Sequence, residues 1–408
     1  MAEILFIAPG FPPFEFSENI VNGKLVLAFL KAGHKVTVIT KVDEGDTYSS
    51  EWRDPWLPLK EVTHVIKVPS SNNFTRFLQV IQGVILFKFP LVGLRWAHLA
   101  YRESKRLIKE KKIEILITRS PNDIGHILGL RLKKEFKITW FANWNDPSDA
   151  IWPPPYDMKM PFWEKIISNR FASKVMACAD LITFPSEMLF LHFTRFFNID
   201  NSKVHIVPHI MLEPNQVIHS TDNTGDLHLM HSGNLSKERD PAILLEAIQK
   251  FNMLGKGKIF LDILGVVSLD TLNLINNLQI TEYINVRKPL PYSEAMKLMA
   301  NYDVLVIIEA RMERGIFLPS KISDYVQLGK PIFSISPERG EIAGIFEKFG
   351  GGIIADNNSI DDIFNKLTHL MQLKLDGNLS KEFNYIKLRE YLNAGKVVSV
   401  YSNSARAQ

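Results

Sequence analysis

Short apolar runs alternate with helical patterns along the first half of the chain. Apolar runs of strand length predict buried strands at Ile4–Ala8, Lys35–Thr40, Val62–Val68, Ile113–Thr118 and Ile138–Ala142. Between them, apolar residues at helical spacing predict helices at Ile20–Lys31, Gly93–Lys111 and Ile124–Lys134. This alternation indicates a parallel sheet with crossover helices, an architecture that binds ligands at the carboxyl ends of its strands.

The second half repeats the pattern. It predicts strands at Leu227–His231, Lys258–Leu264, Tyr283–Val286, Val304–Ile308 and Pro331–Ser334. Helices are predicted at Asp240–Phe251, with Asp240 as N-cap, at Ser293–Ala300, and at Lys321–Leu328, which Gly329 ends. We therefore predict an α/β chain of two facing Rossmann-like domains, residues 1–216 and 226–385, with a polar linker at 217–225 and an interdomain cleft. A C-terminal helical segment, residues 386–408, is expected to pack back on the first domain.

Composition and missing motifs exclude several classes of protein. The 408 residues are 46% hydrophobic and 23% charged, which excludes a disordered chain. The one cysteine, Cys178, excludes an intrachain disulfide and a cysteine zinc site. The first residues predict a strand rather than a signal peptide, and the longest apolar stretch, 77–94, is too interrupted to span a bilayer, so we expect a cytoplasmic protein. No dinucleotide fingerprint, P-loop, nucleophile elbow or His-pair metal motif is present.

Candidate anion-binding residues follow strands of the second half. Gly233 comes after the strand Leu227–His231 and allows the backbone to approach a ligand closely, and Arg239 lies a few residues on. Lys321 lies in the first turn of a helix, where the helix dipole favours an anion, so a bound phosphate would explain a lysine there. Asp324, one turn further on, has the chemistry to accept hydrogen bonds from a ribose diol. The alternatives are a tight turn and a lysine that extends into water.

Candidate substrate-binding residues follow strands of the first half. Phe11 and the run Ser17-Glu18-Asn19 come after the first strand, and Asn145-Asp146 follows Ile138–Ala142. Asp146 has the chemistry to orient a substrate hydroxyl or to act as a base. The alternatives are an ordinary strand-to-helix turn with Ser17 as N-cap and an Asx-turn at Asp146. His126 is either a residue of the cleft or a structural histidine.

Several of these stretches resemble one family. Phe11-Pro12-Pro13, and the run Leu27–Thr40 ending in GHKVTVIT, resemble the opening of family-four glycosyltransferases of the GT-B fold. The stretches Ile206–Ile210, Ser232-Gly233-Asn234-Leu235 and Arg239-Asp240-Pro241 resemble the entry to the second domain of that family and its donor-phosphate loop. Pro319–Tyr325, followed by Gly329–Ile332, resembles the donor helix of the bacterial surface-polysaccharide branch.

The resemblance implies a metal-independent glycosyltransferase that retains the anomeric configuration and takes its sugar from a nucleotide-sugar. The amide of Gly233 with Arg239 and Lys321 would hold the diphosphate, and Asp324 would hold the ribose. The other implied donor contacts are Asn234, Tyr325, Arg287 and Lys288. Asp146, Arg239 and Lys321 would be the catalytic residues, and the implied acceptor contacts are Phe11, Ser17, Glu18, Asn19, His126, Asn145 and Asp146. No cofactor and no metal are implied.

Three departures from the family pattern bear on this carry-over. Ser17-Glu18-Asn19 stands where the family often has two glycines, and Asn234 stands in place of an arginine. The residue eight before Asp324 is Ile316, so the usual pair of glutamates is incomplete, and Glu309 does not fit the spacing. The competing hypotheses are therefore a nucleotide-sugar epimerase of GT-B fold and a catalytically inactive sugar-binding partner in a polysaccharide assembly complex.

Positive charge gathers in one stretch of the first half. Residues 74–112 hold nine Lys or Arg and two Glu, a local net charge of +7, whereas the whole chain carries +4. Aromatic residues lie among these cations, a combination that suits an anionic membrane surface and a lipid-diphosphate-linked acceptor. The alternative is a crossover helix with a solvated basic face. We expect a protein that is peripheral at the inner face of the membrane, and no nucleic-acid partner, because no recognisable module is present.

Overall fold

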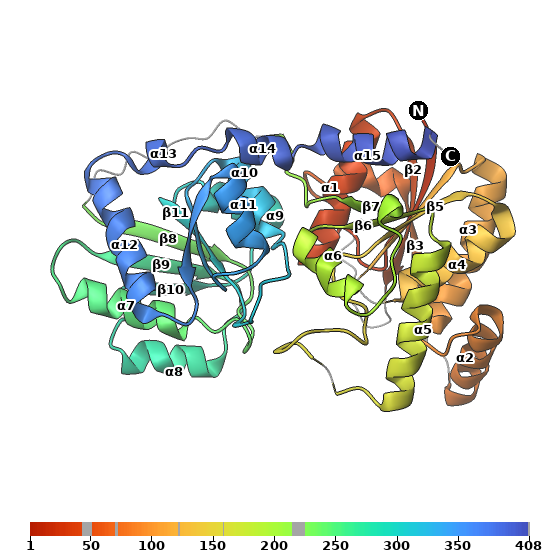
Figure 1. The fold of residues 1–408 in the computed structure, drawn as a ribbon, viewed down its shortest axis with the longest axis horizontal. Coiled ribbons are helices and arrows are strands. Elements are labelled where there is room, and N and C mark those ends of the chain that lie inside the picture. Colours follow the sequence, from red (N-terminus) through yellow and green to blue (C-terminus); the bar gives the residue numbers. More distant parts are fainter. Residues whose placement is uncertain (43–50, 70–71, 121–122, 158, 214–224, 407–408) are drawn as a thin grey trace. The chain divides into compact units, whose positions relative to one another are not determined.

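The computed structural model describes the chain except for residues 43–50, 70–71, 121–122, 158, 214–224 and 407–408. It divides into two compact units (Figure 1). The first contains Met1–Pro153, Asp157–Ile210 and Ala394–Gln408, and the second contains Pro154–Tyr156 and Met211–Asn393.

The first unit is built on a seven-stranded parallel sheet with the strand order β3-β2-β1-β4-β5-β6-β7. Its strands are β1 (Glu3–Ile7), β2 (Lys35–Val42), β3 (Thr63–Lys67), β4 (Ile115–Arg119), β5 (Thr139–Asn143), β6 (Leu181–Phe184) and β7 (Val204–Ile206). Its α-helices are α1 (Ser17–Lys31), α2 (Asn73–Phe87), α3 (Leu94–Lys111), α4 (Ile124–Phe136), α5 (Phe162–Cys178), α6 (Glu187–Thr194) and α15 (Ala394–Arg406). The 3-10 helices are Leu57–Val62 and Asn201–Lys203.

The second unit has a six-stranded parallel sheet with the order β10-β9-β8-β11-β12-β13. Its strands are β8 (Leu227–Ser232), β9 (Ile259–Leu264), β10 (Ile284–Arg287), β11 (Val304–Ile308), β12 (Ile332–Ser336) and β13 (Gly352–Asp356). Its helices are α7 (Ala242–Asn252), α8 (Leu269–Asn277), α9 (Tyr292–Met299), α10 (Lys321–Leu328), α11 (Glu341–Phe349), α12 (Ile360–Leu375), α13 (Leu379–Glu382) and α14 (Ile386–Tyr391).

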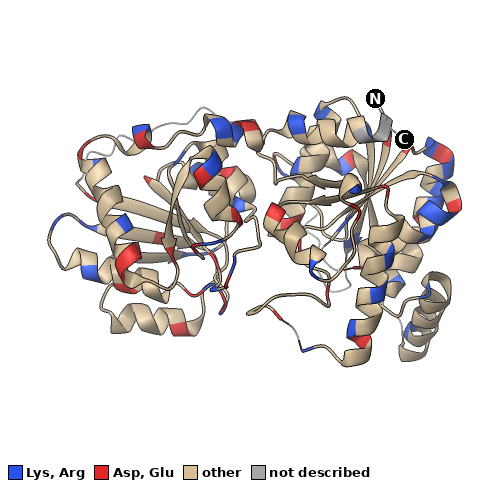
Figure 2. Cartoon of the chain, viewed as in Figure 1, with Lys and Arg blue, Asp and Glu red and all other residues tan. Residues whose placement is uncertain are grey.

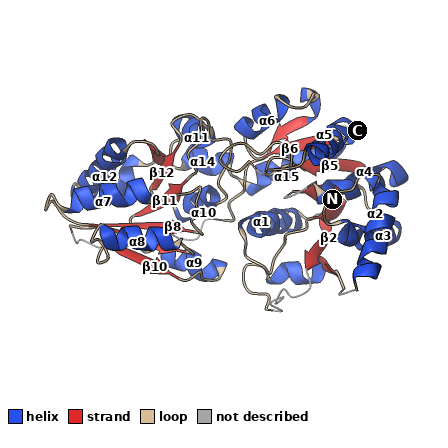
Figure 3. Cartoon of the chain, turned by 90° about the horizontal axis from the view of Figure 1, so that it is seen from below, coloured by secondary structure: helices blue, strands red, loops and turns tan. Residues whose placement is uncertain are grey.

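Both sheets are sandwiched between helices, as Figure 3 shows for each unit. The central strands β4 and β11 are buried along their whole length, because helices cover both faces of a parallel sheet. In both sheets the strand order reverses beside the first strand of the unit, β1 or β8. In open α/β sheets ligands bind outside the strand ends at such a reversal. The parallel α/β architecture predicted from the alternation is therefore confirmed.

The ends of the units differ from the expected ranges. The first unit ends at Ile210 rather than at residue 216, and α14 stays with the second unit. The last helix, α15, belongs to the first unit, where the Tyr401 ring makes an edge contact with Phe29 of α1 and a tilted contact with Phe141 of β5. Apart from Gly225, the predicted linker 217–225 lies outside the described residues.

Two local details also differ from the sequence prediction. The helix expected at Asp240–Phe251 spans Ala242–Asn252, so it begins two residues later, with Pro241 at the cap position. The Asp240 carboxylate still accepts a 3.0 Å hydrogen bond from the Ala242 amide. The apolar stretch after residue 73 forms a helix of its own, α2, ahead of α3. Among the described helices, none is long and apolar enough to cross a membrane.

Candidate functional site

In the second unit, two glycines bring the ends of β8 and β9 into close contact. Gly233 has a φ of 126°, a conformation that only glycine adopts readily. A Cβ at Gly265 would lie 2.4 Å from the Gly233 carbonyl oxygen, so that position also requires glycine. The Gly233 amide donates to the Leu264 carbonyl at 2.8 Å. This amide is therefore committed to the backbone, which corrects the expectation that it holds a diphosphate.

Lys321, the first residue of α10, fills the space above Gly233. A Cβ at Gly233 would lie 2.9 Å from the Lys321 Nζ atom. That Nζ atom lies 3.4 Å from Nε2 of His231, a histidine with no exposed surface. The other ring nitrogen of His231, Nδ1, is 3.0 Å from the Val306 carbonyl, which only accepts, so Nδ1 carries the proton and Nε2 accepts from Lys321. Burial, and then the charge of Lys321, hold the pKa of His231 well below 6.5, so the ring is neutral.

The charges around Lys321 leave the cluster positive. Glu309, at the end of β11, is buried, and its Oε1 lies 4.0 Å from Nε of Arg239. Burial raises the pKa of Glu309, and Arg239 and Lys321 oppose that rise. Burial, followed by the charge of Arg239, lowers the pKa of Lys321 to about 8. Two cations thus share one carboxylate, and a bound anion would stabilise the protonated form of Lys321.

The next residues of α10 have different surroundings. Asp324 Oδ1 accepts a hydrogen bond of 2.6 Å from the Tyr292 hydroxyl, at a partly exposed position. Tyr325 is fully buried; its hydroxyl accepts from the Ser232 amide and donates to the Val306 carbonyl, both at 3.2 Å. Tyr325 therefore anchors α10 to the end of β8 and the middle of β11, and the expectation that it contacts a donor is corrected.

The remaining predicted donor residues have other contacts. The Asn234 Oδ1 atom accepts from the Val266 amide at 2.9 Å, so this exposed side chain joins the two glycine loops. Arg287 ends β10, two strands away from β8, and its guanidinium pairs with the Asp262 carboxylate. Lys288 follows it and is exposed.

In the first unit, a carboxylate cluster forms where β1, β4 and β5 end. The Asn145 side-chain amide donates to both carboxylate oxygens of Glu18, at 2.7 and 2.8 Å. Arg119, the last residue of β4, places Nη2 at 3.8 Å from Glu18 and donates from Nε to the Asn22 side chain at 2.6 Å. Burial raises the pKa of Glu18 to about 8; Arg119 opposes this rise, and the charge of Asp146 adds to it.

Other acceptor candidates of the first unit serve its core. Phe11 is buried and packs on Phe6, with ring centroids 6.3 Å apart, so its side chain does not face an acceptor. His126 is also buried; its Nδ1 lies 2.8 Å from the Thr118 hydroxyl and its ring lies 4.3 Å from that of Trp144. Burial lowers the pKa of His126 to about 3, so it is a structural, neutral histidine.

The first-loop residues Ser17 and Asn19 have local roles in the structure. Asn19 is buried and donates to the Phe11 carbonyl at 3.2 Å, which shapes the loop after β1. Ser17 is an exposed residue that begins α1, and Phe16, not Ser17, occupies the cap position.

Comparison with known proteins identifies a family for most of the first unit. The family model Glycosyltransferase Family 4 matches residues 20–210, nearly all of the first unit outside α15. Residues 20–210 belong to glycosyltransferase family 4. The chain is therefore a glycosyltransferase, as the sequence resemblance predicted.

Solved structures of similar fold cover the whole chain. The glycosyltransferase from Rickettsia africae ESF-5 is 13% identical with a TM-score of 0.66, over 100% of this chain and 99% of that one. Anabaena Alr3699/HepE in complex with UDP and glucose is 11% identical with a TM-score of 0.69, over 100% of both chains. WaaG, a glycosyltransferase involved in lipopolysaccharide biosynthesis, is 12% identical with a TM-score of 0.62, over 98% of both. These likenesses show the GT-B fold, and no curated protein sequence matches the chain.

Several residues of this glycosyltransferase join the clusters although sequence reasoning did not select them. Glu309 did not fit the expected glutamate spacing, and His231 carries no signal of its own beyond its place beside Gly233. Arg119 is the last residue of β4, and Asn145 follows β5 at the same edge of the sheet. A polar residue at the end of a predicted strand is a sequence signal for a ligand site, and it could have identified Arg119.

A second buried carboxyl group, that of Asp123, contacts the loop that carries Asn145. The Asp123 carboxylate accepts from the Ser148 hydroxyl at 3.0 and 3.1 Å and from the Ser168 hydroxyl at 2.9 Å. Burial, and then the charge of Asp149, raise the pKa of Asp123 to about 8. Asp123 thus fastens the loop that carries Asn145 and Asp146 to α5.

Proposed function

We propose that this glycosyltransferase moves a sugar from a nucleotide-sugar to a glycan or lipid-linked acceptor, with retention at the anomeric carbon and without a metal ion. The observation that carries the donor half is the position of Lys321 above Gly233, beside Arg239. As the bond from the anomeric carbon to the phosphate oxygen breaks, negative charge gathers on the leaving diphosphate. Lys321 and Arg239 stabilise that charge, the role that a metal ion has in other enzymes.

The acceptor half of the proposal uses the cluster of the first unit. Asn145 and Glu18 offer a hydrogen-bonded amide and carboxyl, and Asp146 lies close enough to raise the pKa of Glu18. Asp146 orients the acceptor hydroxyl. That hydroxyl bonds to the anomeric carbon on the face that the diphosphate leaves, and its proton passes to the departing phosphate oxygen, which gives retention.

The substrate classes are proposed from the neighbours. The Anabaena protein binds UDP and glucose, which supports a nucleotide-sugar donor. WaaB is a lipopolysaccharide outer core galactosyltransferase and WaaG is involved in lipopolysaccharide biosynthesis, which supports an acceptor in capsule, O-antigen or exopolysaccharide synthesis. An acceptor of this class places the enzyme at the inner face of the cell membrane.

The test is turnover of a panel of UDP-, GDP-, dTDP- and ADP-sugars in the presence of EDTA. We expect hydrolysis or transfer with at least one donor, and a loss of about 100-fold or more in kcat in Lys321→Ala and in Arg239→Ala. Lys256→Ala is the matched control, because Lys256 is exposed and the charge change is equal. Wild-type kcat in both site variants would overturn the assignment of these residues.

Two further outcomes decide between the competing functions. Interconversion of the sugar with an intact nucleotide would establish an epimerase instead. Binding of a nucleotide-sugar with no turnover in any acceptor mixture would indicate an inactive sugar-binding partner.

A further inference from the structure

One helix of the first unit turns a stripe of large apolar side chains to the outside. In α2 the residues Phe74, Phe77, Leu78, Ile81 and Ile85 follow the spacing i, i+3, i+4, i+7, i+11, so they share one face of the helix. All five are exposed, with Phe74 at 69%, Phe77 at 61% and Ile85 at 62%. Single exposed apolar residues are ordinary, but a continuous stripe of five marks a binding surface.

The opposite face of α2 fixes the direction of this stripe. Gly83 is buried, and a Cβ there would lie 2.8 Å from the Leu94 Cβ, so α2 packs closely on the start of α3. Phe87 is buried and makes an edge contact with Tyr101 of α3 at 5.9 Å. Gln79 accepts a 2.6 Å hydrogen bond from Arg95. The helix is thus held to α3 along one face, and the stripe cannot rotate inward.

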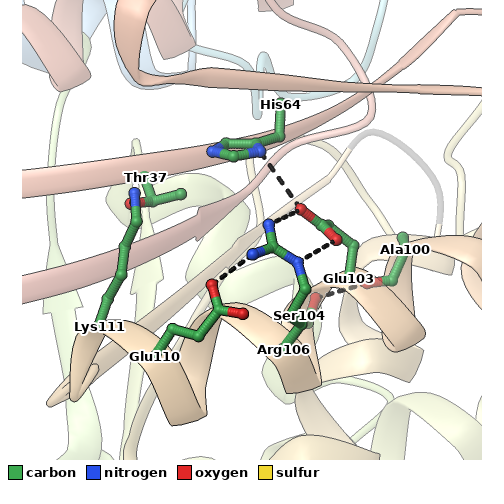
Figure 4. Close-up of polar contacts among 8 residues, drawn as sticks. All are labelled: Thr37, His64, Ala100, Glu103, Ser104, Arg106, Glu110 and Lys111. Atoms are coloured by element: carbon green, nitrogen blue, oxygen red, sulfur yellow. Dashed lines mark hydrogen bonds and ion pairs between the residues drawn. The ribbon is translucent and has the colours of Figure 1, made fainter.

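The basic helix α3 differs from α2, which corrects the sequence expectation. Its apolar and aromatic residues face the core: Leu94 and Trp96 are 2% and 1% exposed. Some of its cations are paired within the unit. Arg106 binds Glu103 and Glu110, and Lys111 donates to Thr37 at 3.0 Å (Figure 4). Lys105 binds Glu135 at 2.5 Å. Figure 2 shows charges of both signs along α3, whereas α2 is mostly without charge.

The charge around the stripe selects an anionic bilayer as its occupant. No Asp or Glu occurs between Glu61 and Glu103, while Arg76 and Lys88 on and beside α2 are exposed. At 15 residues, α2 is about 22 Å long and too short to span a bilayer, so it fits a helix that lies in the interface. The segment after α2 also contacts α5: the rings of Phe89 and Phe171 have centroids 5.1 Å apart. The first two residues of α5, Phe162 and Trp163, are exposed aromatic side chains.

We propose that α2 is the membrane-docking element of this chain, and that Phe74, Phe77, Leu78, Ile81 and Ile85 insert into the interface of an anionic lipid bilayer. Arg76 and Lys88 contact the lipid headgroups. The purpose of the contact, access to a membrane-borne acceptor, rests on the proposed function, but the contact itself does not.

Co-sedimentation with vesicles tests this assignment. One set holds phosphatidylglycerol and phosphatidylethanolamine in equal parts, and the other holds phosphatidylcholine alone. We expect the full chain to bind the anionic set. Phe77→Glu/Ile81→Glu should lower the bound-to-free ratio by about tenfold or more, because two inserted side chains become charged. Binding that persists in part at high salt supports insertion, and complete loss at high salt overturns it in favour of purely electrostatic contact.

The matched control is Met253→Glu/Leu269→Glu, which adds the same charge at exposed apolar positions of the second unit. It should bind vesicles like the wild type. Vesicle binding by Phe77→Glu/Ile81→Glu equal to that of the wild type would overturn the proposal. A wild-type dimer without lipid that this variant dissociates would also overturn it, because the stripe would then be a self-association surface. Nucleotide-sugar hydrolysis, measured in parallel, should be unchanged in both variants. If neither the wild type nor any variant hydrolysed a nucleotide-sugar while the wild type still bound vesicles, that result would count against the proposed function alone.

Discussion

The two candidate clusters of this chain differ in the groups that they gather: cations in the second unit, and carboxyl and amide groups in the first. In the second unit, Lys321 and Arg239 surround the single carboxylate of Glu309. In the first unit, Glu18 and Asp146 accompany the single cation of Arg119. An excess of cations suits a phosphate-bearing donor, whereas carboxylates and amides suit the hydroxyls of an uncharged sugar.

The surrounding architecture does not explain this difference. Both clusters lie at the carboxyl ends of parallel strands near the point where the strand order reverses, after β8 and β11 in one unit and after β1, β4 and β5 in the other. The fold therefore determines where a ligand binds, and a few side chains at the strand ends determine which ligand it is.

Gly233→Ala is expected to have the largest combined effect on stability and turnover, because it displaces Lys321 in the cation-rich cluster without removing a charge. The new Cβ would lie 2.8 Å from Cε and 2.9 Å from Nζ of Lys321, at a φ of 126°. We expect a loss of roughly 1–3 kcal/mol in the free energy of unfolding and of about 100-fold in donor kcat/KM. Urea unfolding and nucleotide-sugar hydrolysis measure both.

Gly255→Ala is the control for backbone strain. Its φ is 67°, and nothing lies within 4 Å of the added Cβ. Stability should fall while donor kcat/KM stays unchanged. Retained turnover in Gly233→Ala would show that the position of Lys321 above this glycine is not needed.

Glu18→Gln should reveal the pH dependence that belongs to the first unit. The pKa of Glu18 is raised from 4.5 to about 8, so the folded state binds its proton more tightly than the unfolded state. The resulting stability is present below pH 4.5 and is lost as pH rises to about 8, at up to about 1.4 kcal/mol per pH unit. In urea unfolding the decline should be smaller in the variant than in the wild type, and part of the remaining decline belongs to Asp123, whose pKa is also raised to about 8. Parallel curves for the two proteins would contradict a buried, protonated Glu18.

Lys321 gives the stability of the second unit a pH dependence of opposite sign. Its pKa is lowered from 10.5 to about 8, so its contribution to stability is complete above pH 10.5 and is lost as pH falls toward 8. Lys321→Met should remove this decline, and unfolding curves between pH 8 and pH 10.5 check it. A dependence that survives in the variant would belong to other groups.

Tyr325→Phe is expected to have the smallest effect. It removes the hydroxyl that bridges the Ser232 amide and the Val306 carbonyl, which should cost about 1–2 kcal/mol of stability. Donor KM should change by no more than about twofold, whereas Asp324→Asn should raise it. A large rise in donor KM for Tyr325→Phe would show that the Tyr325 hydroxyl contacts the donor after all.

Two residues that were selected separately from local sequence features lie together in the structure. Gly233 and Lys321 were selected separately, one as a glycine after a strand and the other as a lysine against a helix dipole, and the structure brings them into contact. Glu309 and His231 could not be selected in the same way, because their roles depend on neighbours that are distant in sequence.

The direction in which a side chain faces was predicted less well. Phe11 and His126 follow strand ends, yet packing against Phe6 and Trp144 turns them into the core. The stripe of α2 has the spacing of a buried helix face, and only its attachment to α3 through Gly83 and Phe87 shows that it faces outward.

The central claim is that Lys321 meets the diphosphate of the donor. Calorimetric titration at pH 8 with UDP, GDP, dTDP and ADP, in two buffers of different ionisation enthalpy, measures the protons taken up on binding. The pKa of Lys321 is lowered to about 8, so at this pH Lys321 is only partly protonated and a diphosphate beside it should draw in a fraction of a proton. We predict this uptake for the diphosphate that binds, and its loss in Lys321→Met. Binding without proton uptake, or with equal uptake in the variant, would contradict the account.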